Sequence, residues 1–367
     1  MSALCQKRTF VLQATCADFA NCAAGQHGGA KYGMGLDGTK PTAEAPGARG
    51  FSGERSVAMR VLIAGAIGAI GRPLVQCLRE RGHAVFALAR LTPSSRAVAE
   101  LGAEPVTADA LDAAAVKTAI GRIRPEAVVN ELTSLPRHYT PAEMRAAAPR
   151  DAKVRINGNA NLLAAFGDAG VRRYVLQSTG FWYAPGAGLA DESTPFAFEA
   201  SPSVADGARR YAELEATASA TPGIEFVALR YGFFYGPGTW FSSEGDMGEQ
   251  VRRQEVPIVG NGEGVWNWVH IDDAAAATAA ASECVPGAYN IVGDDPTPQC
   301  SWLPAFARAV GASPPPRMTE QEALDVAGPD TVYYATRLRG AANTKAKRGL
   351  NFHPRLLEWL SAGRSGG

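Results

Sequence analysis

Apolar residues follow one another without a break where the folded part of the chain begins. The run MRVLIAG, residues 59–65, predicts a buried parallel strand. It is followed by a glycine-rich turn, an amphipathic helix and a second apolar strand that ends near Arg90. Residues 61–90, VLIAGAIGAIGRPLVQCLRERGHAVFALAR, are therefore predicted to form one βαβ unit.

Two more strand patterns follow this unit. They lie in EPVTADALD, residues 104–112, and in EAVVNELTS, residues 126–134. Because strand-like and helix-like segments alternate, the pattern predicts an α/β fold with a doubly wound parallel sheet, the Rossmann arrangement.

Residues 1–58 show no comparable order. Gly, Ala, Thr and isolated charges follow one another there without a strand or helix period. We interpret this segment as a disordered tail or as an extension from a misassigned start codon. No apolar run in the chain reaches the roughly 18–20 residues that a membrane-spanning helix needs.

The glycines of the first turn, Gly65, Gly68 and Gly71, indicate a nucleotide site. Their spacing is GxxGxxG. The first glycine permits a tight turn, the second lets the backbone approach a pyrophosphate, and the third lets the helix pack closely on the strand. Unpaired N–H groups at the helix N-terminus attract the phosphates. We expect the whole loop to bind a dinucleotide, through Gly65, Ala66, Ile67, Gly68, Ala69, Ile70 and Gly71.

The end of the second strand bears on which dinucleotide binds. An NAD site usually has an acidic residue there for the ribose 2′-hydroxyl, whereas this chain has Ala89 and Arg90. Arg90 can face a 2′-phosphate, although it can also be a solvated charge at a strand end. We therefore expect NADP, with NAD as the alternative. Asp109, Ala110 and Leu132 follow the next two strands and are expected in the same cofactor groove, with Asp109 at the adenine.

Charge and cysteine content bear on the kind of binding partner and on the cell compartment. Thirty-six basic residues balance 36 acidic ones, so we expect a small-molecule substrate and neither nucleic acid nor a membrane surface. The six cysteines are scattered and are interpreted as reduced thiols of a cytoplasmic protein. The five histidines are isolated in sequence, so no metal site is expected.

Several dispersed motifs occur in a recognisable order after the glycine loop. They are INGNANLLAAF (156–166), RRYVLQST (172–179), LRYGFFYGPG (229–238), WVHIDDAAAA (268–277), GAYNIVG (287–293) and NTKAKRGLNFHP (343–354). With them, residues 60–355 resemble the extended short-chain dehydrogenase/reductase superfamily, in its NAD(P)-dependent epimerase/dehydratase branch. The resemblance implies one domain over residues 59–355, with a smaller C-terminal substrate lobe from about 183–206, 235–262 and 295–342. It also implies a C-terminal tail at 356–367 and a homodimer.

The resemblance further implies residues of the site. In that superfamily the strand ending in VLQST delivers a hydroxyl to the substrate, and the matching residue is Thr179, with Ser178 beside it. The segment that passes under the nicotinamide is matched by Arg230, Tyr231, Gly232 and Phe233.

The stretch ARRYAELEA, residues 208–216, departs from the superfamily. Its members use a tyrosine as acid or base, and a lysine one helical turn later lowers the tyrosine pKa and holds the ribose. Here Glu215 follows Tyr211 at that spacing. In a second register Tyr211 takes the lysine position and Gly207 the tyrosine position. Neither register supplies a lysine, because the chain has none between Lys153 and Lys345.

Two functions remain open at this stage. The first is an NAD(P)-dependent oxidoreductase or epimerase/dehydratase-like enzyme for a small carbonyl, hydroxyl or sugar-type substrate, with a modified site. Thr179 would orient the carbonyl there, and Tyr183, Tyr211 or a water would supply the proton. The second is a non-enzymatic NADP(H)-binding sensor or interaction module. Five aromatic residues also suggest an aromatic substrate pocket: Phe234, Trp240, Phe241, Trp266 and Trp268. The alternative is that they pack in a core, as large aromatic residues more often do.

Overall fold

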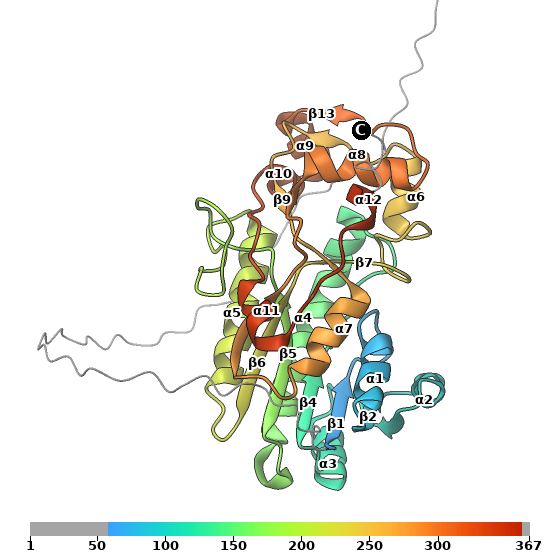
Figure 1. Ribbon diagram of the computed structural model, residues 1–367, viewed down its shortest axis with the longest axis vertical. Coiled ribbons are helices and arrows are strands. Elements are labelled where there is room, and N and C mark those ends of the chain that lie inside the picture. Colours follow the sequence, from blue (N-terminus) through green and yellow to red (C-terminus); the bar gives the residue numbers. More distant parts are fainter. Residues whose placement is uncertain (1–57, 362–367) are drawn as a thin grey trace, which may run out of the picture. The chain divides into compact units, whose positions relative to one another are not determined.

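The computed structural model describes residues 58–361, so the predicted N-terminal tail lies outside the described residues except for Ala58. Seven parallel strands form the central sheet, in the order β11-β6-β5-β4-β1-β2-β3 (Figure 1). The winding reverses between β1 and β4, which confirms the predicted doubly wound sheet. The strands are β1 Arg60–Ala64, β2 Ala84–Ala89, β3 Glu104–Thr107, β4 Ala127–Asn130, β5 Arg173–Thr179, β6 Glu225–Tyr231 and β11 Gly287–Ile291.

Helices cover both faces of this sheet. One face packs against α1 (Gly71–Glu80), α7 (Ile271–Ala280) and α11 (Thr344–Leu350). The other packs against α3 (Ala113–Ile123), α4 (Pro141–Ala164) and α5 (Pro202–Ser219). Successive residues of a strand point to opposite faces, so Val61 and Ile63 join the first core while Leu62 and Ala64 join the second. This double burial explains why β1 is a continuous apolar run. The helix α2 (Thr92–Glu100) and the short 3-10 helix η1 (Gly167–Ala169) complete this part of the chain.

The remaining elements are short and gather beyond the carboxyl ends of the strands. Three small sheets pair β7 (Phe233–Tyr235) with β10 (Trp268–His270), β8 (Ile258–Val259) with β13 (Arg317–Met318), and β9 (Val265–Trp266) with β12 (Thr297–Pro298). The accompanying helices are α6 (Asp246–Arg252), α8 (Gln299–Ala309), α9 (Glu320–Ala327), α10 (Pro329–Thr336) and α12 (Glu358–Ser361). Within residues 58–361 no helix has both the length and the apolarity of a membrane span.

An aromatic core holds these short elements together. Phe241, Trp266 and Trp268 are 2%, 4% and 2% exposed, so they pack in the interior and do not line the predicted aromatic pocket. Trp359 of α12 is buried against Trp268 and Phe306 at ring-centroid distances of 5.3 and 5.0 Å. The folded part of the chain therefore continues beyond the domain end predicted at residue 355.

A buried ion pair ties α5 to the sheet. Arg230 of β6 donates from Nε and Nη2 to the two carboxylate oxygens of Glu215, at 2.9 and 2.7 Å. Ser178 of β5 donates from Oγ to the same carboxylate at 2.5 Å. The side chains of Arg230 and Glu215 are only 9% and 13% exposed. One carboxylate thus joins a helix to two neighbouring strands.

We expect Arg230→Met to lower the free energy of unfolding by about 3–5 kcal/mol, because it leaves the buried Glu215 carboxylate without its cation. Urea unfolding measures this loss. Arg209→Met is the matched control, since Arg209 pairs with Asp206 at the surface, where the side chains are 58% and 69% exposed. That control should lose less than about 1 kcal/mol. Equal losses of unfolding free energy in the two variants would contradict the expectation that the buried pair stabilises the fold more than the surface pair.

Candidate active site

The glycine loop between β1 and α1 has room only for backbone. Gly65 has a φ of +106°, and a β-carbon there would lie 2.5 Å from the carbonyl oxygen of Glu131. A β-carbon at Gly71 would lie closer than 3.0 Å to the carbonyl oxygen of Gly65. Residues 67–69 are exposed at the N-terminus of α1, whereas Ala66 and Ile70 are buried in the core. Exposed backbone at a helix N-terminus attracts phosphate, so these residues fit a dinucleotide pyrophosphate.

The other residues predicted for the cofactor follow β2, β3 and β4. Arg90 is exposed, and its side chain makes no hydrogen bond or ion pair with any other residue of the described part of the chain. Asp109 is half-buried and accepts a hydrogen bond from the Leu111 N–H at 3.0 Å. Ala110 and Leu132 pack against α4, where a β-carbon at Gly158 would lie 3.7 Å from Ala110 Cβ and 2.7 Å from Leu132 Cδ1.

Thr179 and Ser178 end the strand β5 but differ in their contacts. Thr179 is 1% exposed, and its Oγ1 has no hydrogen-bond partner within the described residues. A buried hydroxyl without a partner destabilises the fold unless a ligand or water bonds to it. This hydroxyl lies at the carboxyl end of β5, the end of the strands at which α/β folds bind ligands. The Ser178 hydroxyl is already engaged by Glu215. Of the two hydroxyls, that of Thr179 is the one available to a ligand.

Tyr183 is buried and held by two polar contacts. Its side chain is 1% exposed, and its phenol donates a hydrogen bond to Asn290 and accepts one from Arg230 at 3.4 Å. Burial raises the pKa of Tyr183 to about 12, although the positive charge of Arg230 opposes the shift. These contacts fix Tyr183 within the interior.

The helix α5 brings Gly207 and Tyr211 to the carboxyl side of the sheet, one turn apart. A β-carbon at Gly207 would lie closer than 3.0 Å to Cζ3 of Trp182, so the indole occupies the space beside the helix there. The ring of Tyr211 lies 6.0 Å from the ring of Trp182, and the guanidinium carbon of Arg155 lies 5.4 Å from its centroid. Burial raises the pKa of Tyr211, and the charge of Arg155 opposes the rise.

Arg155 belongs to a network on α4 that fixes the loop after β4. It pairs with Asp151 at 2.7 Å, and both side chains are buried. Asp151 in turn accepts a hydrogen bond from the Ser134 N–H at 2.6 Å. The network therefore sets the course of the chain as it leaves β4.

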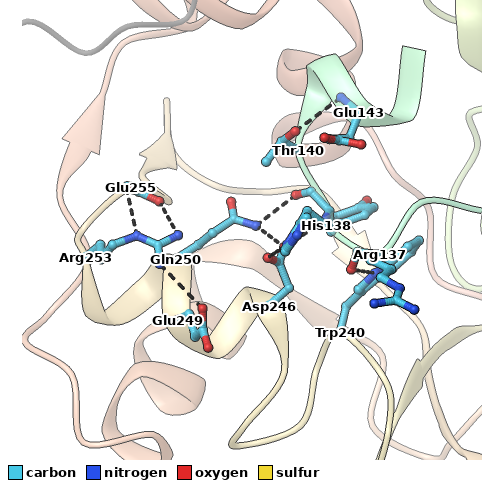
Figure 2. Close-up of polar contacts among 11 residues, drawn as sticks. Arg137, His138, Thr140, Glu143, Trp240, Asp246, Glu249, Gln250, Arg253 and Glu255 are labelled. Carbon is cyan, nitrogen blue, oxygen red and sulfur yellow. Dashed lines mark hydrogen bonds and ion pairs between the residues drawn. The ribbon is translucent and has the colours of Figure 1, made fainter. Parts of the chain in front are cut away.

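The far end of the same loop is fastened to α6 (Figure 2). Asp246 accepts hydrogen bonds from the Tyr139 N–H and from Gln250 Nε2, each at 2.6 Å. His138 Nδ1 lies 2.8 Å from the other carboxylate oxygen of Asp246. Held at both ends, the loop joins the nucleotide side of the molecule to the smaller elements.

The segment expected under the nicotinamide is engaged in internal contacts. Tyr231 is 1% exposed, and its hydroxyl lies 2.6 Å from Thr278 Oγ1. A β-carbon at Gly232 would lie 2.6 Å from the carbonyl oxygen of Asn267. Phe233 stacks against Phe181 and other rings of the aromatic core. Together with the ion pair of Arg230, these contacts show that the side chains of this segment stabilise the fold. Contact between this segment and a cofactor stays a prediction.

Glu131, the residue after β4, is a candidate that the sequence analysis missed. It is 7% exposed and accepts a hydrogen bond from the Tyr231 hydroxyl at 2.9 Å. Its Cβ would lie 3.2 Å from a β-carbon at Gly65, so it sits directly beneath the glycine loop. Burial raises the pKa of Glu131 to about 8, although the Tyr231 hydrogen bond and the Arg155 charge oppose the shift. The available signal was an acidic residue at the end of an otherwise apolar strand.

We expect the Glu131 carboxyl to make stability fall as pH rises. Its pKa of about 8 in the folded protein lies above the ordinary value of 4.5, so between these values the folded state binds more protons than the unfolded state. The free energy of unfolding of the wild type, relative to Glu131→Gln, should then fall by up to about 1.4 kcal/mol per pH unit in that window. Urea unfolding of both proteins from pH 5 to pH 9 measures the difference, and a difference that does not change with pH would contradict this expectation.

The model of the NAD dependent epimerase/dehydratase family matches residues 61–291. A 3-diazoavenalumate denitrifying reductase from Streptomyces sp is 40% identical over 304 residues, which cover 82% of this chain and 98% of that protein. A 2-alkyl-3-oxoalkanoate reductase from Stenotrophomonas maltophilia (strain K279a) is 27% identical over 267 residues, 69% of this chain and 76% of that protein.

The fold is also similar to that of solved structures. A human epimerase family protein, SDR39U1, with NADPH superposes with a TM-score of 0.61 at 20% identity, covering 84% of this chain and 98% of that one. The family match, the glycine loop and the relatives agree on a nicotinamide cofactor. This chain therefore belongs to the NAD-dependent epimerase/dehydratase family and is a nicotinamide-dependent enzyme of the oxidoreductase or epimerase type.

Proposed function

We propose that this protein is an NAD(P)H-dependent reductase whose substrate accepts a hydride without a proton from a tyrosine, and that the accepting group is an aryl diazonium. The observation that carries the proposal is the environment of α5. Glu215 is committed to Arg230 and Ser178, and Trp182 occupies the space beside Gly207. We infer that the second register holds, with Tyr211 in the lysine position and Gly207 in the tyrosine position.

This environment suits some hydride acceptors better than others. A carbonyl becomes an alkoxide when it accepts a hydride, and a positioned acid is worth about 10²–10⁴-fold in rate. The tyrosines near the site are poor acids because burial raises the pKa of Tyr183 and Tyr211. An aryl diazonium is already cationic, so a hydride converts it to a neutral aryldiazene. That species releases N₂ as the C–N bond breaks, and the new ring C–H takes the diazene N–H proton, directly or by exchange with water, so the reaction balances without a protein acid.

The residues of this chain have separate tasks in this proposal. The glycine loop and the N-terminus of α1 hold the pyrophosphate, and a bound nicotinamide supplies the hydride. The unpartnered hydroxyl of Thr179 binds a polar group of the ligand at the end of β5. Asp151 and Arg155 keep the loop after β4 in place.

The comparisons support a reductase over the alternative of a sensor. The Streptomyces relative is named for the denitrifying reduction of a diazo compound, and the second relative for reduction of an oxoalkanoate. Both are enzymes, so the non-enzymatic NADP(H)-binding module is not favoured. We further propose a cytoplasmic location and a homodimer, which rest on composition and family analogy.

NADP is the cofactor that we propose, and Arg90 is the reason. Its side chain is exposed at the end of β2 and makes no ion pair within the described residues, which leaves it able to meet a 2′-phosphate. In calorimetric titrations the wild type should bind NADPH more tightly than NADH. Arg90→Ala should lose about 1–3 kcal/mol of that preference. An unchanged preference in the variant would assign the discrimination to other residues.

Product analysis tests the proposed reaction. Under anaerobic conditions we expect NADPH oxidation to be matched by equal amounts of N₂ and anisole formed from a 4-methoxybenzenediazonium salt, faster with the enzyme than with NADPH alone. A 3-oxoalkanoate serves as the comparison substrate. Reduction of the 3-oxoalkanoate to its 3-hydroxy product, with no enzyme-dependent anisole, would replace the diazonium proposal with carbonyl reduction.

Tyr211→Phe tests whether a tyrosine acts as the acid. Because no proton transfer from Tyr211 is proposed, the variant should keep kcat/KM within about tenfold of the wild type. Loss of a general acid would instead cost about 10²–10⁴-fold. Thr179→Val is the companion variant and should lower kcat/KM by about 2- to 10-fold, as expected for one neutral hydrogen bond. A loss above 10²-fold in Tyr211→Phe would restore a tyrosine-dependent mechanism.

A further inference from the structure

Three half-buried aromatic side chains lie together near the end of β5. Phe181 and Trp182 come two and three residues after Thr179 in the loop that follows β5, with their ring centroids 5.2 Å apart. The indole Nε1 of Trp182 donates a hydrogen bond to the hydroxyl of Tyr334 on α10 at 3.0 Å. All three rings pack against the fully buried core around Trp266 and Trp268, but each is itself only partly covered by the protein.

The Trp182 indole lies where a side chain at position 207 of α5 would otherwise be. A β-carbon at Gly207 would meet Cζ3, Cη2 and Cε3 of the indole, two of them closer than 3.0 Å. Glycine within a helix costs about 0.5–1 kcal/mol relative to alanine. The indole packs against two apolar cores but is not fully buried, so part of it stays open to a ligand.

Thr179 supplies an independent sign of a ligand at the same place. Thr179 is 1% exposed, and its buried hydroxyl has no hydrogen-bond partner within the described residues. It precedes Phe181 by two residues at the carboxyl end of a central strand. A polar anchor and aromatic residues thus follow one another closely in sequence at the carboxyl end of β5, which is the composition of a site for a planar ligand with one polar end.

We propose that Trp182 is the platform on which an aromatic ring of the substrate stacks, with Gly207 as the residue that gives the indole its position. This inference rests on the proposed function and deepens it by naming the residue that receives the aryl ring. An indole is the strongest partner among side chains for a cationic or electron-poor group above its face. Stacked rings gain more than apolar contact alone, and this gain is absent for a saturated ring of the same size.

A pair of unreactive acids tests the platform. Calorimetric titration of the protein with 3-phenylpropanoate and 3-cyclohexylpropanoate, with and without NADP⁺, compares an aromatic and a saturated ring on the same carboxylate. The wild type should bind the phenyl acid about 2- to 10-fold more tightly. Trp182→Leu should reduce the ratio to about one, whereas Trp182→Phe should keep a ratio above one.

Gly207→Ala is expected to displace the indole and lower the ratio in the same way. Gly121→Ala on α3 is the matched control, since a β-carbon there meets nothing within 4 Å. It should leave the ratio unchanged. Circular dichroism and urea unfolding confirm that each variant is folded before its titration is interpreted.

The outcomes separate this inference from the proposed function. Loss of the phenyl preference in Trp182→Leu, with NADP⁺ binding unchanged, supports the platform. A ratio of one in the wild type, a ratio that survives in Trp182→Leu, or no binding of either acid at millimolar concentration overturns it. Failure of the wild type to bind NADP⁺ overturns the proposed reductase, whatever the ratio between the acids.

Discussion

The ion pair between Glu215 and Arg230 fixes the position of α5, and the arrangement of the candidate site depends on it. A helix can slide or rotate along a sheet unless a specific contact sets its register. Here one carboxylate meets a guanidinium from β6 and a hydroxyl from β5, both in the interior. The position of Glu215 sets the positions of Tyr211 and Gly207, one and two turns earlier on the helix. The contact of Tyr211 with Arg155 and of Gly207 with Trp182 follow from that register.

Much of the fold could be predicted because local sequence determines it. The continuous apolar strand β1 and the glycine turn after it are short-range patterns, and they matched the structure almost residue by residue. The aromatic residues were harder to place. Trp266 and Trp268 flank the polar Asn267, which is compatible with a pocket wall or with a core. Only their contacts with Trp302 and Phe241, distant in sequence, decide for the core.

Some residues of the candidate site could likewise be predicted from local sequence, and others could not. The glycine loop was visible because its spacing is local, and the strand-end position of Thr179 was visible because a motif carries it. The engagement of Tyr183 by Asn290 joins residues more than a hundred positions apart, so no local pattern reveals it. Glu131 was overlooked for a related reason. Its meaning depends on burial beneath the glycine loop and on Tyr231 from a distant strand.

The contact between Gly207 and Trp182 also limits how this protein can evolve. A tyrosine at position 207 alone would collide with the indole, and a lysine at position 211 alone would bring a second cation close to Arg155. In the register that we propose, each single step toward the tyrosine–lysine pair of the superfamily therefore carries a loss that later steps must repair. The pair would then require coordinated change at three positions or more. Because these positions depend on one another, single substitutions do not restore the pair.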